Sequence, residues 1–242
     1  VTSLGNGLNI FRWTVTSAQG CTSTDDVGIT YNFISANAGL PQETCNSSVT
    51  MAAGNPAPGT GTWSQVSGNP STITDPTLAT TTITGLTAGD YTFRWTVLYN
   101  GCTATSDVIV TNSSPQNALA NTPSPEVCNN IGTLIGSALL PGERGLWTIP
   151  SGSGIIANNT LNNTTVSNLG LGNNIFRWTI TKGTNVNCTS QAQVTITNNT
   201  VSANAGPDQD ICTNTANLAA TAPTPGIGVW PKFGINPAVI TD

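Results

Sequence analysis

Histidine is missing from this 242-residue chain, and only 7% of its residues are charged. Six Lys and Arg against eleven Asp and Glu give a net charge of −5. A nucleic-acid partner needs basic patches, because phosphate contacts supply most of the affinity, and this chain cannot offer one. The longest apolar stretch, residues 134–140, is far too short to cross a bilayer. The composition therefore excludes a nucleic-acid partner and membrane insertion by this segment.

The side chains that usually perform catalysis are also scarce. Without histidine, and with only two lysines, no nucleophile has an evident general base. A hydrolase would need a paired-carboxylate cleft, and no spacing in the sequence brings two carboxylates together. We therefore expect no catalytic residue, no cofactor and no enzymatic activity.

What the chain does contain is one pattern in several copies. Phe-Arg-Trp-Thr recurs at Phe11, Phe93 and Phe176. Its period is the length of a whole domain rather than of a solenoid turn. In each complete copy a cysteine comes first, then a tryptophan, then the tryptophan of Phe-Arg-Trp-Thr and finally a second cysteine. The first two spacings vary by one residue between copies, and the last spacing varies from 7 to 10 residues. All cysteines and tryptophans fit this frame: Cys21, Cys45, Cys102, Cys128, Cys188, Cys212, Trp13, Trp63, Trp95, Trp147, Trp178 and Trp230.

This frame predicts four segments. Residues 1–33 form the C-terminal part of one repeat, 34–112 and 113–200 are complete repeats, and 201–242 are the N-terminal part of a further repeat. Because both ends fall in mid-repeat, we expect the chain to be a window on a longer protein.

The local pattern within a repeat has a period of two residues. In "YTFRWTV", the side chains of Tyr91, Phe93, Trp95 and Val97 share one face of a strand. Asn100-Gly101, between this run and the next, is a strong signal for a two-residue hairpin turn. Seven or so short strands in about 80 residues predict a two-sheet sandwich with no helix. We expect the six tryptophans to build the sandwich cores rather than to stack on sugars.

Two stretches carry a resemblance to a known family. "SANAGPDQDIC", residues 202–212, is similar to the opening of a PKD-type immunoglobulin-like domain, and "LTAGDYTFRWTV" resembles the sixth strand of that family. The cysteine-bearing version resembles the repeats of giant surface proteins of Bacteroidota, in the style of the SprB-type mobile adhesins of gliding bacteria. The resemblance implies an all-β chain of tandem Ig/PKD-like sandwich domains, one per repeat and arranged end to end.

The repeated charged residues have two possible roles, as ligand contacts or as structural groups. Arg12, Arg94 and Arg177 could contact a ligand, but alternation favours outward-facing arginines that meet an acceptor on a neighbouring strand. Calcium needs six to eight oxygens from converging carboxylates. No acidic cluster recurs in each repeat, so we expect no metal site from the remaining candidates, Asp25, Asp26, Asp107, Asp208 and Asp210.

The function that these observations favour is structural and adhesive. We expect a stalk or filament segment of a large secreted cell-surface adhesin, in surface attachment or gliding motility, whose partners are neighbouring repeats of the same chain. The alternative is an array of carbohydrate-binding modules attached to a secreted enzyme, with surface polysaccharide as the partner. Cysteines in strict register indicate an oxidising, extracellular compartment.

Two disulfide pairings remain open. Proximity in sequence suggests Cys45–Cys102 and Cys128–Cys188, each within one repeat. In an up-and-down sandwich, however, the two cysteines of a repeat lie at opposite ends, ~20 Å apart for a six-residue strand, whereas bonded cysteines need Cα atoms within ~7 Å. That argument favours Cys45–Cys188, between neighbouring repeats. Cys21, Cys102, Cys128 and Cys212 would then bond with partners outside this sequence.

Overall fold

The structure is a computed structural model that describes residues 1–184, 187–224, 226–231, 233–234 and 239–240. Over these residues, every helix or strand that the structure defines is a β-strand. This confirms the all-β prediction. No helix in the described ranges is long and apolar enough to span a membrane.

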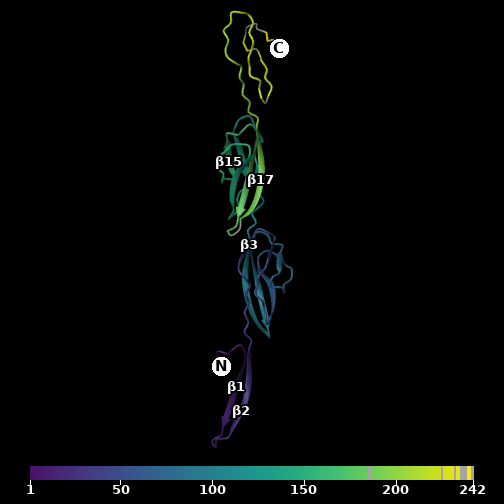
Figure 1. Ribbon diagram of the computed structural model, residues 1–242, viewed down its shortest axis with the longest axis vertical. Helices are drawn as coiled ribbons and strands as arrows, with labels where there is room; N and C mark the ends of the chain where they lie inside the picture. Colours follow the sequence, from purple (N-terminus) through teal and green to yellow (C-terminus); the bar gives the residue numbers. More distant parts are fainter. Residues whose placement is uncertain (185–186, 225, 232, 235–238, 241–242) are drawn as a thin grey trace. The chain divides into compact units, whose positions relative to one another are not determined.

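The first segment is a single antiparallel hairpin (Figure 1). It consists of β1 (Gly7–Thr16) and β2 (Thr22–Tyr31), which form a two-stranded sheet of their own. Both strands are exposed along most of their length, and 72% of the Trp13 surface is accessible. The expected core role of Trp13 is therefore wrong for this structure, because no second sheet among the described residues covers the hairpin.

The second segment is a sandwich of seven strands in two sheets, as the alternation predicts. The first sheet has the order β3 (Gln42–Thr44), β9 (Cys102–Asn112), β8 (Gly89–Tyr99) and β5 (Thr60–Ser67). The second has the order β4 (Ser48–Thr50), β7 (Thr82–Thr84) and β6 (Thr72–Ile73). The pair β3–β9 is parallel, whereas the other pairs are antiparallel. Consequently the C-terminal ends of β3 and β9 lie at the same end of the sandwich.

The third segment repeats this arrangement with one additional edge strand. Its first sheet has the order β11 (Glu126–Val127), β17 (Cys188–Asn198), β16 (Gly172–Lys182) and β13 (Arg144–Ser151). Its second has the order β10 (Ala120–Asn121), β12 (Gly132–Gly136), β15 (Asn163–Ser167) and β14 (Ile155–Ile156). The pair β11–β17 is again parallel. The two segments therefore share one strand order.

Each sandwich closes around its own tryptophan pair. Trp63 and Trp95 have ring centroids 5.1 Å apart with planes tilted by 47°, and Trp147 and Trp178 lie at the same 5.1 Å with a tilt of 39°. All four side chains are at most 2% exposed, in two separate cores. Trp230 is 41% exposed, contrary to its expected core role, because the described residues of 201–240 form no strand that could cover it.

A glycine two residues before the first tryptophan makes room for the second one. A Cβ atom on Gly61 would lie 1.9 Å from Cζ2 of Trp95, and one on Gly145 would lie 2.2 Å from Cη2 of Trp178. The same Gly-x-Trp spacing occurs at Gly228 and Trp230. This signal was present in the sequence, and the prediction from the repeats missed it.

The start of each long central strand is tied to the loop before it. The Tyr91 hydroxyl accepts from the Thr87 N–H at 2.8 Å and donates to the Thr87 carbonyl at 3.0 Å, as in the tyrosine corner of immunoglobulin-like sandwiches. Asn174 takes this place in the third segment, where its amide donates to the Gly170 carbonyl at 2.8 Å. The equivalent strands β8 and β16 are thus tied to their preceding loops by different side chains, Tyr91 and Asn174.

The chain divides into two compact units, residues 1–115 with 182–189, and residues 116–181 with 190–242. The division after Pro115 lies close to the predicted boundary at 112. Residues 1–33 and 201–242 are not separate units, and the four-segment division stays a prediction from the sequence. The hairpin tip 182–189 belongs to the first unit, although the sequence frame assigns it to the third segment.

Candidate linkage site at Cys45 and Cys188

The parallel pairing of β3 with β9 determines where Cys45 lies. Thr44 pairs with Asn112, the last residue of β9, so Cys45 stands just beyond the end of that strand. Cys102 is the first residue of the same strand, ten positions earlier, which corresponds to about 33 Å at the rise of a β-strand. This separation exceeds the ~20 Å expected from the sequence, because β9 has 11 residues instead of six.

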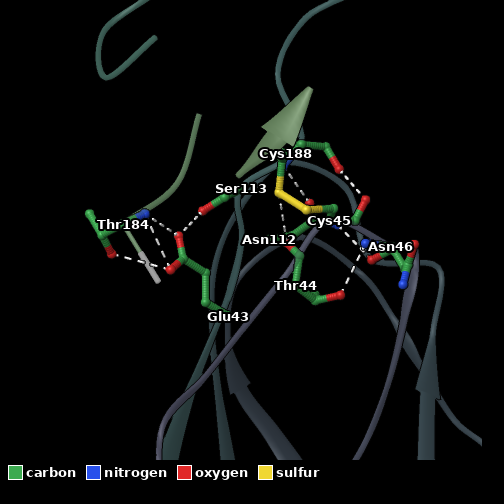
Figure 2. The surroundings of a disulfide bond; sticks show 9 residues. Glu43, Thr44, Cys45, Asn46, Asn112, Ser113, Thr184 and Cys188 are labelled. Atoms are coloured by element: carbon green, nitrogen blue, oxygen red, sulfur yellow. Dashed lines mark hydrogen bonds between the residues drawn. A yellow bond between two sulfur atoms is a disulfide. The ribbon is translucent and has the colours of Figure 1, made fainter. Parts of the chain in front are cut away.

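Cys45 forms a disulfide with Cys188, the first residue of β17 (Figure 2). The two Cα atoms are 5.3 Å apart, within the range for bonded cysteines, and the sequence separation is 143 residues. The pairing that the topology favoured is therefore confirmed. The pairings Cys45–Cys102 and Cys128–Cys188 are wrong, since each would need a cysteine that this bond already uses.

A carboxylate two residues before Cys45 makes a second contact with the same hairpin tip. Glu43 accepts hydrogen bonds from the Thr184 N–H, at 3.0 and 3.3 Å to its two oxygens, and from the Thr184 hydroxyl at 3.2 Å. The Ser113 hydroxyl also donates to Glu43. Figure 2 shows Glu43 between these two partners, on the opposite side of the strand end from Asn46. The linkage is thus a covalent bond supplemented by a charge-assisted hydrogen-bond group.

Hydrogen bonds to the backbone carbonyls around Cys45 hold it in position for this bond. The Ser113 N–H donates to the Thr44 carbonyl at 2.9 Å, and the Ser114 hydroxyl donates to the Cys45 carbonyl at 2.7 Å. The Asn112 amide donates to the Asn46 carbonyl at 3.0 Å. Cys188 itself is only 1% exposed. The end of β3 is therefore fixed by β9 and the residues that follow it.

The four other cysteines are all exposed, and none forms a disulfide within the described residues. They comprise Cys21 and Cys102, next to or at the start of a second hairpin strand, and Cys128 and Cys212, at the position of Cys45 in their own repeats. That these four bond with partners outside this sequence stays a prediction.

The repeated arginines pair across neighbouring strands, as alternation suggested. Arg12 and Asp26 form two hydrogen bonds of 2.7 and 2.8 Å, and Arg94 and Asp107 form two of the same lengths. Each hydrogen-bonded guanidinium lowers the pKa of its aspartate. In the third copy, the Gln193 amide oxygen, when it faces Arg177, accepts at 3.1 and 2.8 Å.

These pairs also account for two of the acids considered as calcium ligands. Asp26 and Asp107 each hold an arginine across the hairpin. Asp25, Asp208 and Asp210 join no cluster of three or more potential metal ligands among the residues that the structure places. The candidate functional site of this chain is accordingly the cysteine linkage.

Comparison with known proteins agrees with the fold. Residues 46–111, from just before β4 to the end of β9, match the family model described as the K319L-like PKD domain. This match and the strand order identify the repeated unit as a PKD/Ig-like β-sandwich. No curated protein matches the chain.

Among solved structures, the N-terminal eight Ig domains of Down Syndrome Cell Adhesion Molecule are 12% identical, with a TM-score of 0.44. That match covers 80% of this chain, which spans only 31% of the other. Extracellular domains 3–5 of Drosophila OTK are 8% identical with a TM-score of 0.42, covering 79% of this chain and 71% of that one. The fibronectin(III)-like modules of Clostridium thermocellum CbhA are 15% identical with a TM-score of 0.28, covering 67% and 90%.

Proposed function

We propose that this chain is a segment of the structural stalk of a large secreted adhesin at the cell surface, in which disulfide bonds join successive PKD/Ig-like repeats. One observation carries the proposal: Cys45 belongs to the second segment of the sequence frame, and its partner Cys188 belongs to the third. A disulfide of this kind persists in oxidising compartments, which supports an extracellular location.

The bond changes how tension passes along the chain. Force that enters from the N-terminal side reaches Cys45, crosses the disulfide and continues from Cys188. The 143 residue steps between the two cysteines then lie outside the covalent path that carries the tension. Most strands of both sandwiches belong to this protected stretch. A stalk built in this way resists extension even when a sandwich opens.

The resemblance of the cysteine-bearing repeats to SprB-type adhesins of Bacteroidota supports a more specific role. In that role the segment serves surface attachment or gliding motility, its partners are neighbouring repeats of the same chain, and it performs no catalysis. The buried position of Trp63, Trp95, Trp147 and Trp178 makes these repeated aromatics unavailable for stacking on polysaccharide. For this reason we favour the stalk over the carbohydrate-binding array.

Single-molecule force spectroscopy tests the proposal. The chain is held by its two ends and stretched to full extension, first in oxidising buffer and then with a thiol reductant. We expect reduction to add about 500 Å of contour length, because each of the 143 released steps spans at most ~3.6 Å.

The control is the Cys188→Ser chain, which retains the five other cysteines. Its full extension should be the same with and without reductant, and should equal that of the reduced parent chain. If the parent chain gains no length on reduction, the tension path runs through the whole backbone and the proposed stalk mechanism is wrong.

A further inference from the structure

The third sandwich carries an unused copy of the surface that receives the hairpin tip at Cys45. Glu126-Val127-Cys128 has the same acid-x-Cys spacing as Glu43-Thr44-Cys45, and Asp210-Ile211-Cys212 has it again. An acid at this position in all three copies was not singled out by the sequence frame, which followed cysteines and tryptophans only. We propose that Glu126 and Cys128 form a second receiving site.

The two sites are built in the same register. In the second sandwich Glu43 pairs with Thr111 and Thr44 with Asn112, and in the third Glu126 pairs with Thr197 and Val127 with Asn198. The paired residues occupy equivalent places at the ends of β9 and β17.

The hydrogen bonds around the two sites also correspond. The Ser113 N–H donates to the Thr44 carbonyl at 2.9 Å, and the Asn199 N–H donates to the Val127 carbonyl at 2.8 Å. The asparagine that ends the long strand accepts from the residue two positions later in both, at 2.9 Å in the second sandwich and 3.0 Å in the third. Two of the hydrogen bonds that order the backbone around Cys45 therefore have counterparts around Cys128.

The receiving groups of the second site are accessible. Glu126 and Cys128 are both exposed, and a hollow lined in part by Cys128, Asn198 and Thr200 opens beside the thiol. At the first site, the equivalent groups already hold a ligand, since Glu43 accepts from Thr184 and Cys45 is bonded to Cys188. The occupied site thus shows what the exposed one can bind.

The occupant is the hairpin tip of another repeat of this type. Such a tip offers a cysteine at the start of its last strand and a hydroxyl residue nearby for the carboxylate. Thr184 stands four positions before Cys188, and Ser17 stands four positions before Cys21. The Ser17 oxygen accepts from the Cys21 N–H at 3.1 Å, which leaves its own proton free to be donated. The tip of the first hairpin therefore offers a thiol for Cys128 and a hydroxyl proton for Glu126, whereas the Ser17 N–H already donates to the Cys21 carbonyl at 2.8 Å.

Bond formation needs an oxidant, and disulfide exchange with oxidised glutathione supplies it. A Cys21 thiolate attacks glutathione disulfide, releases one glutathione thiol and becomes a mixed disulfide. The Cys128 thiolate then attacks the Cys21 sulfur, forms the Cys128–Cys21 bond and releases the second glutathione thiol. One glutathione disulfide is reduced to two thiols for each protein disulfide formed.

This inference rests on the proposed function, and its test uses two variants of the full chain, both of which keep Cys45 and Cys188. The receiver has Cys21, Cys102 and Cys212 replaced by serine, and the donor has Cys102, Cys128 and Cys212 replaced. Equal amounts are mixed in a glutathione redox buffer. We expect the heterodimer joined by Cys128 and Cys21 to exceed the two homodimers combined, which is its share in unselective oxidation, as measured by non-reducing peptide mass mapping.

Glu126→Gln in the receiver separates recognition from general thiol reactivity. We expect the heterodimer yield to fall roughly three- to tenfold, because the glutamine amide oxygen still accepts a hydrogen bond but a charge-assisted bond is about twice as strong as a neutral one. The reaction of Cys128 with dithiobis(nitrobenzoate), an anionic disulfide, should not slow, because the substitution removes a repelling negative charge. Asp208→Asn, which removes an equal charge from the same unit, should leave the heterodimer yield unchanged.

A statistical mixture of homodimers and heterodimers, or an unchanged or higher yield with Glu126→Gln, overturns the inference. Its failure is distinct from that of the proposed function. The same digest reports the Cys45–Cys188 peptide pair, and in this digest it is the absence of that pair, and not the heterodimer yield, that contradicts the stalk proposal.

Discussion

At the scale of single residues, each sandwich depends on an indole that fits against bare backbone. Trp95 and Trp178 are fully buried, and each lies where a side chain on the facing glycine would be. Close packing leaves no room for even one added methyl group at such a place. A substitution at Gly61 therefore disturbs Trp95 directly, although the two residues are far apart in sequence.

Removing the indole should destabilise the second sandwich strongly. We expect Trp95→Ala to cost about 3–5 kcal/mol in free energy of unfolding, the range for truncating a large aromatic side chain in a core. Chemical denaturation followed by fluorescence measures this cost. Trp13→Ala is the matched control, since Trp13 occupies the same motif position but is 72% exposed, and it should change stability by less than about 0.5 kcal/mol. Equal effects for both variants would contradict the assignment of Trp95 to the core.

Filling the space beside the indole should also be costly. Gly61→Ala places a Cβ atom 1.9 Å from Cζ2 of Trp95, so the ring or the strand must move. We expect a loss of about 3 kcal/mol or more, at the upper end of the range for overpacked cores. The neighbouring exposed substitution Thr62→Ala should have little effect, and thermal unfolding of the two variants makes the comparison. If Gly61→Ala unfolds like the parent chain, the close approach of Trp95 is wrong.

At the scale of elements, the two long strands of each hairpin are joined by a polar pair that contains the repeated arginine. Arg94 and Asp107 pair directly across β8 and β9, and Arg12 and Asp26 pair across β1 and β2. The third hairpin has Gln193 in place of the aspartate, so its pair carries no titrating acid. The three hairpins therefore share geometry but differ in their response to acid.

We expect the second hairpin to lose this contribution as the pH falls. The Arg94 hydrogen bond holds the pKa of Asp107 below its ordinary value of 3.8 in the folded state. The stabilising contribution is therefore present above pH 3.8 and is lost as the pH falls through the lowered pKa. Carboxyl titration by NMR should show a pKa nearer the ordinary value in Arg94→Gln. An unchanged Asp107 titration in that variant would show that the pair does not form in solution.

The sequence predicted the strands because their side chains alternate with a period of two, as in the run from Tyr91 to Val97. It favoured the Cys45–Cys188 pairing, while leaving the pairings within one repeat open, because alternation and hairpin turns place the two cysteines of a repeat at opposite ends. It could not predict the contact between Glu43 and Thr184, since the hairpin tips differ in length between repeats. The tip between β8 and β9 has two residues, 100–101, whereas that between β16 and β17 spans 183–187.

At the scale of the whole molecule, the disulfide joins sequence repeats that each have a core of their own. Neither core needs the bond to bury its tryptophan pair, because each pair packs within one sandwich. The bond instead determines which part of the chain is under tension when its ends are pulled. The cores thus keep each sandwich folded and the Cys45–Cys188 disulfide carries the tension, as the proposed stalk requires.

Non-reducing peptide mapping tests the existence of this link most directly. Cleavage after lysine, arginine and glutamate and before aspartate puts each cysteine on its own peptide, with Cys45 in residues 44–74 and Cys188 in 183–207. We expect these two peptides to appear as one disulfide-linked species that reductant separates. Residues 44–74 linked instead to 95–106, which carry Cys102, or recovered with a free thiol, would contradict the linkage between repeats.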